Sequence, residues 1–304
     1  DPPALLLPGD RVRFEPIPRA EFERPAAARV PASASPLFRV ATPGVLTSVQ
    51  GAPRHGWAMY GVPPGGAMDQ ESLALGNARV GNPPQAPALE MTLVGPDLEF
   101  AADAEIAFAG GRVEATVNGR PMAEAGSVRA RDLVRVGAIT GSARAYLCVA
   151  GGLARTDRVT RRLSAGDVVS RDTLPPAPGV APIVEARGAI RVFPGPQRDR
   201  FAPEGLATFL GAAYRVSESS DRRGIRLDGP AIANHASPEI PPEGTALGAI
   251  QVPGDGRPII LGPDRPVTGG YAKIATVVAA DFGRVARAAP GTVLRFEEVS
   301  CPWT

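Results

Sequence analysis

Apolar and polar residues alternate in short runs along most of this chain, and glycine or proline separates the runs. Alternation of this kind is typical of strands that bury one face. Residues 113–122 contain a strand, an Asn-Gly turn and a return strand, which is the pattern of a hairpin. Residues 248–262 repeat that pattern, residues 96–111 add another alternating pair, and residues 275–288 favour a strand leading into a short helix. The pattern predicts a mainly β protein with many turns and a few short helices.

The clearest helical spacing lies in residues 68–82, where Asp69 stands near the start and Gly81 near the end. On a helix, Asp69, Leu73 and Asn77 share one stripe, so two polar side chains lie on the face that carries the apolar anchor. Asp69 can therefore be a site residue on that face or simply the cap of the helix.

A turn followed by a strand occurs at both ends of the chain, in residues 6–17 and 288–299, with a weaker echo in residues 163–170. A turn followed by a closing strand is typical of the end of a structural unit. The occurrence in residues 6–17 therefore predicts the end of a unit that precedes this chain. Ala/Pro-rich stretches separate the remaining parts. We therefore divide the chain into a closing strand (1–24), a linker (25–36), a first β domain (37–172), a Pro-rich connection (173–189) and a second β domain (190–300).

Composition narrows the class of protein. The chain has 33 basic and 31 acidic side chains without long runs of one sign, which argues against nucleic-acid binding. No apolar run is long enough to cross a membrane. The two cysteines, Cys148 in an apolar run and Cys301 near the end, form no disulfide scaffold, and two histidines in turn-like surroundings offer no metal cluster. We expect a cytoplasmic protein without a metal site, a nucleotide-binding motif or a biotin-attachment site of its own.

Lys273 is the only lysine among the 33 basic residues. Arginine supplies generic positive charge but cannot replace lysine where a compact ammonium is needed. The preceding residues Thr268, Gly269, Gly270 and Tyr271 can bring backbone N–H groups close to an anion. Two interpretations stay open: an anion-binding site built around Lys273, or a leftover surface lysine after a tight turn.

A second group of candidates consists of Ser220, Asp221, Arg222 and Arg226. Its arginines can hold a carboxylate or phosphate in bidentate fashion, or the group can be a salt-bridged turn. Glu90 is a lone carboxylate in an apolar strand, so it can serve as a general base or as the partner of an arginine.

Several long segments resemble, in this order, the motifs of one family. They include "YGVPPGGAMDQESLALGNARVGN", "VFPGPQRDRF", "SDRRGIRLDGP" and "RPVTGGYAKIATVVAADF". The family is the biotin-dependent carboxyltransferase-like family, which includes KipA, the 5-oxoprolinase component PxpC, proteins labelled allophanate hydrolase subunit 2 and part of urea carboxylase. The resemblance covers residues 38–299, while residues 1–24 resemble the end of the companion subunit, KipI or PxpB.

The resemblance implies two cyclophilin-like β-barrel domains with a cleft between them. It implies a subunit of an ATP-dependent 5-oxoprolinase that opens the cyclic amide of 5-oxoproline to glutamate, with ATP and magnesium bound at the level of the complex. The implied partners are the KipI/PxpB-like companion, fused upstream, and a third subunit of the LamB/YcsF type. One alternative is a component of a biotin-dependent carboxyltransferase of the urea/allophanate pathway, which alone would need biotin. The other is a non-enzymatic, kinase-regulating protein of the KipA type.

Amide activation requires positive groups around developing negative charge. We therefore assign Lys273 to contact an anion or polarise a carbonyl, and Gln251 to orient the amide. The predicted catalytic residues are Lys273, Asp69 and Glu90. The predicted substrate-binding residues are Gln251, Thr268, Gly269, Gly270, Tyr271, Ser220, Asp221, Arg222, Arg226 and Asn77.

Overall fold

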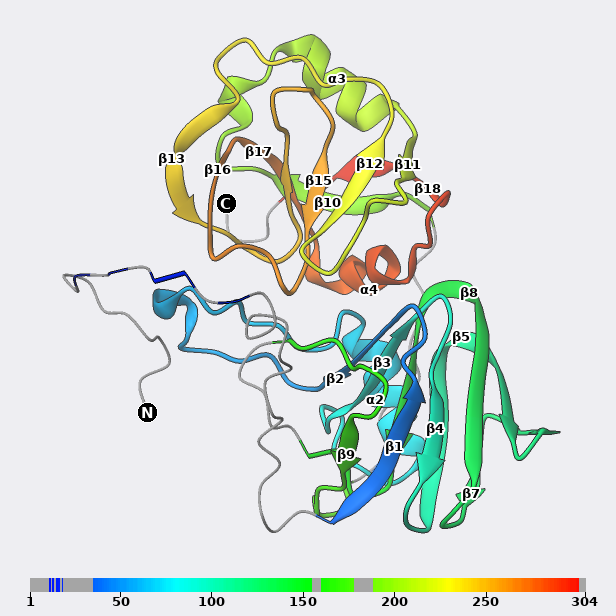
Figure 1. Cartoon of the computed structure of the whole chain (residues 1–304). Helices are drawn as coiled ribbons and strands as arrows, with labels where there is room; N and C mark the ends of the chain where they lie inside the picture. The colour runs from blue at the N-terminus through cyan, green and yellow to red at the C-terminus, as the bar shows by residue number, and fades with distance from the viewer. Residues whose placement is uncertain are drawn as a thin grey trace.

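Strands dominate the structure, a computed structural model that describes residues 11, 13, 15, 16, 18, 35–154, 160–177 and 188–300. Figure 1 shows two curled sheets, one below and one above, with a few short helices around them. Every described strand up to residue 170 belongs to the lower sheet, and every described strand from residue 190 onward belongs to the upper part. The predicted mainly β fold with two barrel-like sheets is confirmed.

The first sheet has nine strands in the order β2-β3-β8-β4-β1-β9, with β5 against β8 and both β6 and β7 against β5. Its long strands β5 and β8 pair along most of their length. The bounds are β1 (Pro36–Thr42), β2 (Leu46–Gln50), β3 (Ala88–Thr92), β4 (Asp97–Phe100), β5 (Ala104–Val117), β6 (Arg120–Pro121), β7 (Ala125–Val128), β8 (Leu133–Val149) and β9 (Val168–Ser170).

The hairpin predicted in residues 113–122 is confirmed. Val117 pairs with Arg120, and the two turn residues between them, Asn118 and Gly119, have φ angles of 51° and 80°, which an Asn-Gly turn adopts readily. The alternating pair in residues 96–111 forms two strands, β4 and β5, but these strands do not pair with each other. Each of them pairs with β8 on one edge. The other edge of β4 is occupied by β1 and the other edge of β5 by β7, so neither strand has an edge left for the other. Alternation predicted the strands but not their partners.

The second half of the chain forms an eight-stranded sheet in the order β18-β11-β12-β15-β14-β17-β10-β19, and a separate ribbon of β13 and β16. The hairpin predicted in residues 248–262 is confirmed as β14 and β15, and residues 288–299 contain the last two strands. The bounds are β10 (Ile190–Pro194), β11 (Tyr214–Val216), β12 (Gly224–Asp228), β13 (Glu239–Gly244), β14 (Ala249–Gln251), β15 (Ile259–Leu261), β16 (Thr268–Tyr271), β17 (Lys273–Val277), β18 (Val293–Leu294) and β19 (Phe296–Glu298).

Three α-helices and two short 3-10 helices complete the described part of the chain: α2 (Gln70–Arg79), α3 (Pro203–Gly211), α4 (Ala279–Arg287), η1 (Ala58–Tyr60) and η2 (Arg198–Arg200). Helix α2 begins where the Asp69 carboxylate accepts a hydrogen bond from Ser72 N at 3.1 Å, and it ends before Gly81, whose φ is 73°. The capping role of Asp69 is therefore confirmed. No helix in the described ranges is long and apolar enough to cross a membrane.

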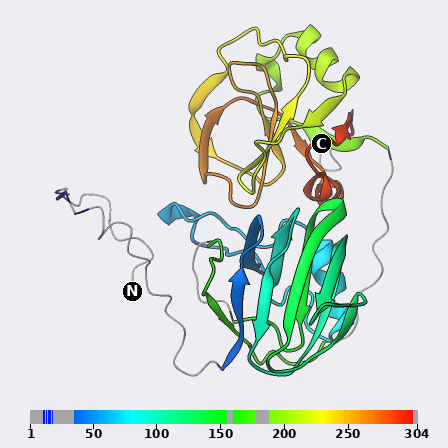
Figure 2. The same ribbon diagram turned by 45° about the vertical axis from the view of Figure 1, so that its right-hand side comes forward.

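Helix α4 lies between the two domains, as both views of the ribbon show (Figures 1 and 2). Its last residue, Arg287, donates to Asp69 at the start of α2 over 2.9 Å, and Arg144 of β8 donates to the carbonyl oxygen of Ala286 over 2.6 Å. Met68, just before α2, is buried with the apolar residues of the second domain. The two domains therefore share a packed, hydrogen-bonded junction. Most of the predicted closing strand (1–24) and linker, and part of the Pro-rich connection, lie outside the described residues.

Candidate functional site

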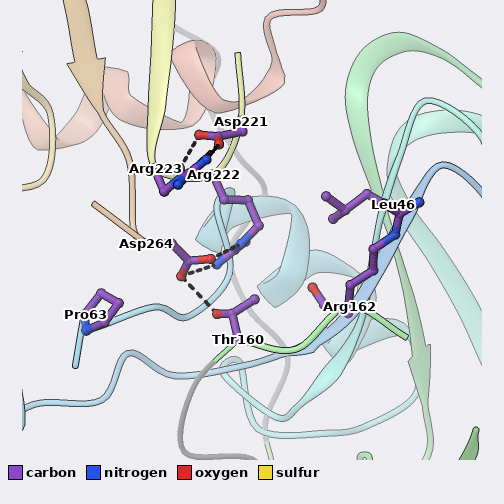
Figure 3. Close-up of a pocket in the computed structure, with 9 residues that line it drawn as sticks. Leu46, Pro63, Thr160, Arg162, Asp221, Arg222, Arg223 and Asp264 are labelled. Carbon is purple, nitrogen blue, oxygen red and sulfur yellow. Dashed lines mark hydrogen bonds and ion pairs between the residues drawn. The ribbon is translucent and has the colours of Figure 1, made fainter. Parts of the chain in front are cut away.

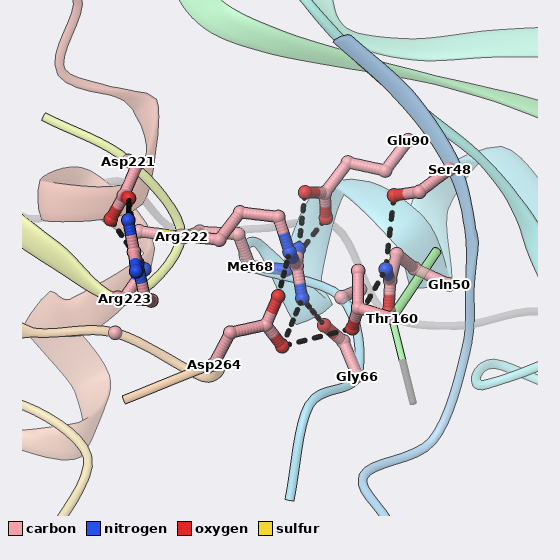
Figure 4. Close-up of polar contacts among 12 residues, drawn as sticks. Ser48, Gln50, Gly66, Met68, Glu90, Thr160, Asp221, Arg222, Arg223 and Asp264 are labelled. Carbon is pink, nitrogen blue, oxygen red and sulfur yellow. Dashed lines mark hydrogen bonds and ion pairs between the residues drawn. The ribbon is translucent and has the colours of Figure 1, made fainter. Parts of the chain in front are cut away.

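Arg222, in the loop between β11 and β12, crosses the domain junction and is only 5% exposed (Figure 4). Its Nε and Nη2 donate to the two carboxylate oxygens of Asp264 over 2.8 and 3.2 Å. Nη2 also donates to Gly66 O over 2.7 Å, and Nη1 donates to Glu90 of β3. All three nitrogens of this guanidinium are therefore engaged by protein oxygens.

Glu90 is fully buried at the same junction. One of its carboxylate oxygens pairs with Arg222, and the other accepts hydrogen bonds from Met68 N and from the Tyr146 hydroxyl, each over 2.7 Å. Burial lowers the pKa of Arg222, but Glu90 and Asp264 more than offset this, so the pKa is raised. Of the two interpretations of Glu90, the structure favours the partner of an arginine.

Burial and the neighbouring Glu90 carboxylate together raise the pKa of Tyr146 well above its usual range. The Tyr146 hydroxyl therefore stays a hydrogen-bond donor to Glu90, and it accepts from Asp69 N over 2.8 Å. The junction is a connected network of hydrogen bonds and ion pairs.

Asp69 and Asn77 both tie α2 to its surroundings. Besides capping the helix, Asp69 pairs with Arg287. Burial lowers the pKa of Arg287, but the Asp69 carboxylate raises it by more, so the pKa is raised. The Asn77 amide nitrogen donates to Ala86 O over 2.9 Å, and its oxygen accepts from Asn82 over 3.0 Å. Asp69 and Asn77 are 1% and 0% exposed, so neither lines an open surface in this arrangement.

The predicted group around Ser220 forms a turn. Asp221 accepts hydrogen bonds from the backbone N–H groups of Arg223 and Gly224 over 2.8 and 3.1 Å, and it pairs with the Arg223 guanidinium at 2.9 Å. Ser220 Oγ accepts from the backbone N–H of Arg226 over 3.1 Å. Arg226 is exposed on β12 whereas Arg222 is buried with its nitrogens engaged, so the arrangement contains no shared grip of the two arginines on one carboxylate. The salt-bridged turn is the interpretation that fits.

Lys273 lies on β17, opposite Gln251 of β14 in the strand register, and is only 3% exposed. Its ammonium nitrogen lies 2.5 Å from Oε1 of Glu243 on the β13 strand. Gln197 donates to the same Glu243 oxygen over 2.9 Å and accepts from Lys273 N over 3.2 Å. The interpretation of Lys273 as a leftover surface lysine is therefore wrong.

The side-chain nitrogen Nε2 of Gln251 is buried beside this lysine and has no hydrogen-bond partner among the described residues. The ammonium of Lys273, which carries three N–H donors, likewise meets no acceptor besides Glu243 in the described part of the chain. A Cβ atom on Gly269 would lie 2.6 Å from Gln251 Nε2, so glycine at this position leaves room for the amide. Buried donors without acceptors are costly, which points to a place for a ligand oxygen.

We call Lys273, Gln251, Glu243, Gln197 and Gly269 the lysine cluster. Hydrogen bonds from Lys273 and Gln197 hold the pKa of Glu243 below its usual range, so this carboxylate stays ionised and keeps the ammonium in place. Two buried donors beside each other can bind an anion or polarise a carbonyl oxygen. Of the other predicted residues here, Thr268 and Tyr271 are exposed on β16 and Gly270 is half-buried between them.

Sequence reasoning missed Glu243 and Gln197. The signal that could have identified Glu243 is the pairing of β13 with β16, which places Glu243 opposite Gly269. Asp264 and Thr160 were also not predicted from the sequence. The Thr160 hydroxyl donates to Asp264 over 2.9 Å across the domain junction. No group of three or more His, Cys, Asp or Glu residues that could hold a metal ion occurs in the described ranges.

A pocket with a volume of about 310 Å³ opens beside the junction network (Figure 3). The first domain contributes Ser48, Thr160 and Arg162 to its walls, and the second domain contributes Asp221–Arg223 and Asp264. The pocket therefore belongs to both domains.

Residues 60–161 and 158–298 match the family described as "Carboxyltransferase domain, subdomain A and B". The chain belongs to this family. The C subunit of the Escherichia coli 5-oxoprolinase is 30% identical over 287 residues, covering 87% of this chain and 92% of that protein. The urea amidolyase of Saccharomyces cerevisiae is 32% identical over 305 residues, covering 86% of this chain but only 17% of that protein.

Two solved structures have a similar fold. The crystal structure of the Kluyveromyces lactis urea carboxylase superposes with a TM-score of 0.79 at 32% identity, covering 88% of this chain and 28% of that one. The crystal structure of TTHA0988 superposes with a TM-score of 0.73 at 33% identity, covering 86% of this chain and 55% of that one. In both of these structures the matching fold is part of a longer chain.

Proposed function

We propose that this chain is a subunit of an ATP-dependent 5-oxoprolinase and that the lysine cluster binds the cyclic amide. The observation that carries the proposal is the pair of buried donors, Lys273 Nζ and Gln251 Nε2, which lack sufficient acceptors among the described residues. The similarity to the Escherichia coli 5-oxoprolinase protein supports this substrate, because it extends over nearly the whole length of that relative.

The proposed chemistry uses this chain's residues to hold and polarise the amide. As the ring amide is attacked, negative charge develops on its carbonyl oxygen, and the Lys273 ammonium and the Gln251 amide N–H stabilise it. Glu243 and Gln197 keep the ammonium fixed, so little reorganisation is needed during the reaction. ATP and magnesium are proposed to bind at the level of the complex.

A second candidate is a component of a biotin-dependent carboxyltransferase acting on urea. The observation that favours it is the match of this chain to the Kluyveromyces lactis urea carboxylase structure. Urea also presents an amide carbonyl, so the same two donors would bind it, and biotin would be required only in this case.

For the oxoprolinase function we propose a KipI/PxpB-like companion and a third subunit of the LamB/YcsF type as partners, in the cytoplasm. The Escherichia coli relative is itself one subunit of its enzyme, which supports a multi-component assembly. Turnover is therefore to be measured with the partners present.

The test is phosphate release from ATP by this protein together with its proposed partners, with either 5-oxoproline or urea added. We expect 5-oxoproline to stimulate release, and Lys273→Ala to lower the stimulated rate by about a hundredfold or more, as for the loss of an oxyanion-stabilising donor. Arg257→Ala is the matched control, because this exposed cation pairs, among the described residues, only with Asp228 on the surface. Stimulation by urea instead would favour the carboxyltransferase, and a Lys273→Ala rate equal to that of wild type would overturn the proposed site.

A further inference from the structure

The pocket between the domains carries positive charge that its own carboxylates do not neutralise. Two of its arginines are already paired, since Arg222 forms a bidentate pair with Asp264 and Arg223 pairs with Asp221. Arg162, on the wall from the first domain, donates, within the described ranges, only to a backbone oxygen, that of Val45. Its charge has no carboxylate partner in the described part of the chain.

A second guanidinium, that of Arg54, lies near Arg222 and Asp264 of this pocket. Burial lowers the pKa of Arg54, the nearby Arg222 lowers it further, and Asp264 opposes both effects. Its Nε and Nη2 atoms have no hydrogen-bond partner among the described residues. In Arg222 the corresponding atoms, Nε and Nη2, both donate to Asp264. The Asp264 carboxylate thus lies near the guanidiniums of Arg54 and Arg222, and of these two it is hydrogen-bonded to that of Arg222.

Two hydroxyl-bearing residues of the first domain, Ser48 and Thr160, line the pocket. Gln50 Nε2 donates to Ser48 Oγ over 3.0 Å and to Thr160 Oγ1 over 3.4 Å, so neither hydroxyl needs to act as a donor to Gln50 (Figure 4). Thr160 directs its own hydrogen to Asp264, whereas the Ser48 hydroxyl has no acceptor among the described residues. Gln50 and Ser48 are fully buried, so this hydrogen-bonded wall of the pocket is held in position by the fold.

We propose that this pocket binds a small oxyanion, the carboxylate or phosphate group of a small molecule. Arg162, on the exposed side of the pocket, contacts the anion directly. Arg54, near Arg222 and Asp264, raises the local positive potential. The volume, about 310 Å³, matches a small ligand. The inference rests on the pocket and its charges and is independent of the amide chemistry proposed at the lysine cluster.

The test is isothermal titration calorimetry of the full chain at low ionic strength, with inorganic phosphate in one series and acetate in the other. We expect saturable one-to-one binding of at least one anion. Arg162→Gln should weaken it about tenfold or more, and Arg54→Gln about threefold to tenfold, since one removes a direct contact and the other a more distant charge. Arg39→Gln is the matched control, because Arg39 is an exposed arginine of the first domain that pairs with Glu99 at 3.5 Å. The anion affinity of this variant should equal that of wild type.

Binding of phosphate alone would identify a phosphate-bearing ligand, and binding of acetate alone a carboxylate. Arg162 is exposed, so its variant is expected to fold, and far-ultraviolet circular dichroism checks this. The proposal is overturned if neither anion binds saturably, or if folded Arg162→Gln binds as tightly as wild type. Because the isolated chain is titrated, this outcome does not depend on turnover by a complex.

Discussion

The second domain buries two cations in contrasting ways. Arg222 meets a carboxylate or carbonyl oxygen at each of its nitrogens, within a network that joins β3 of the first domain to the loops of the second. The lysine cluster places the Lys273 ammonium beside Gln251, whose Nε2 has no partner in the described part of the chain. A satisfied cluster stabilises the folded state, whereas donors left over after folding are available to a ligand. The contrast assigns a structural role to Arg222 and a binding role to Lys273.

The largest predicted effect is the loss of Arg222. Arg222→Met removes the guanidinium that neutralises Glu90, and a buried carboxylate then lacks its main counter-charge. We expect the free energy of unfolding to fall by about 3–5 kcal/mol, measured by urea denaturation.

The adjacent Arg223 is the matched control, since its guanidinium is exposed and pairs with Asp221 in the same turn. Arg223→Met should change the free energy of unfolding by less than about 1 kcal/mol. Equal effects of the two substitutions would contradict the structural role of the Arg222 network.

Asp281 sharpens the comparison, because it is a second fully buried carboxylate whose hydrogen bonds are satisfied. It accepts from Arg191 N, Nε and Nη2 over 2.8, 3.1 and 2.7 Å. Burial alone raises the pKa of Asp281, but the hydrogen bonds from Arg191 more than offset this, so the folded-state pKa is lowered. Asp281 therefore adds stability above its unfolded pKa, about 4, and this stability is lost as the pH falls through the lower folded value.

Asp281→Asn should lower the free energy of unfolding by about 2 kcal/mol at neutral pH, because charge-assisted hydrogen bonds are lost. The difference from wild type should shrink as the pH falls below about 4. Urea denaturation at a series of pH values measures the difference in free energy of unfolding between this variant and wild type. A difference that stays constant down to the most acidic pH would show that the ionised carboxylate is not the stabilising species.

Gly269→Ala tests the lysine cluster with a single methyl group. The added Cβ would lie 2.6 Å from Gln251 Nε2 and 3.1 Å from Thr245 Cγ2, so the amide must move. Because the end of a side chain can shift, we expect unfolding to change by only about 1 kcal/mol, while 5-oxoproline-stimulated phosphate release falls about tenfold or more. Gly244→Ala, on the paired strand β13, is the control, since its Cβ would meet nothing within 4 Å. Equal rates in the two variants would contradict a positioned Gln251.

Local elements were predictable from the sequence because their causes are local. The Asn118-Gly119 turn and the Asp69 cap each depend on a few neighbouring residues. Composition alone singled out Lys273, and the alternation predicted the β4 and β5 strands. The partners of these residues follow from pairings between distant strands, which no local pattern specifies.

Arg222 shows where sequence reasoning stops. Its neighbours Asp221 and Arg223 suggest a turn, and the turn is present, but the Arg222 side chain reaches Glu90, 132 positions away in the sequence. The same limit applied to Glu243, which meets Lys273 only because β13 forms a ribbon with β16. A candidate arginine and a candidate carboxylate thus proved to be each other's partner, and their geometry alone revealed it.

The most direct test of the contrast between the two clusters is the free energy of unfolding of Gln251→Met by urea denaturation. Methionine preserves the volume of the side chain and removes a buried donor that has no acceptor among the described residues. We expect this variant to be as stable as wild type or more stable by about 1 kcal/mol, opposite in sign to Arg222→Met. A loss of about 2 kcal/mol or more would show that the Gln251 amide is satisfied within the fold, and would contradict a site open to a ligand.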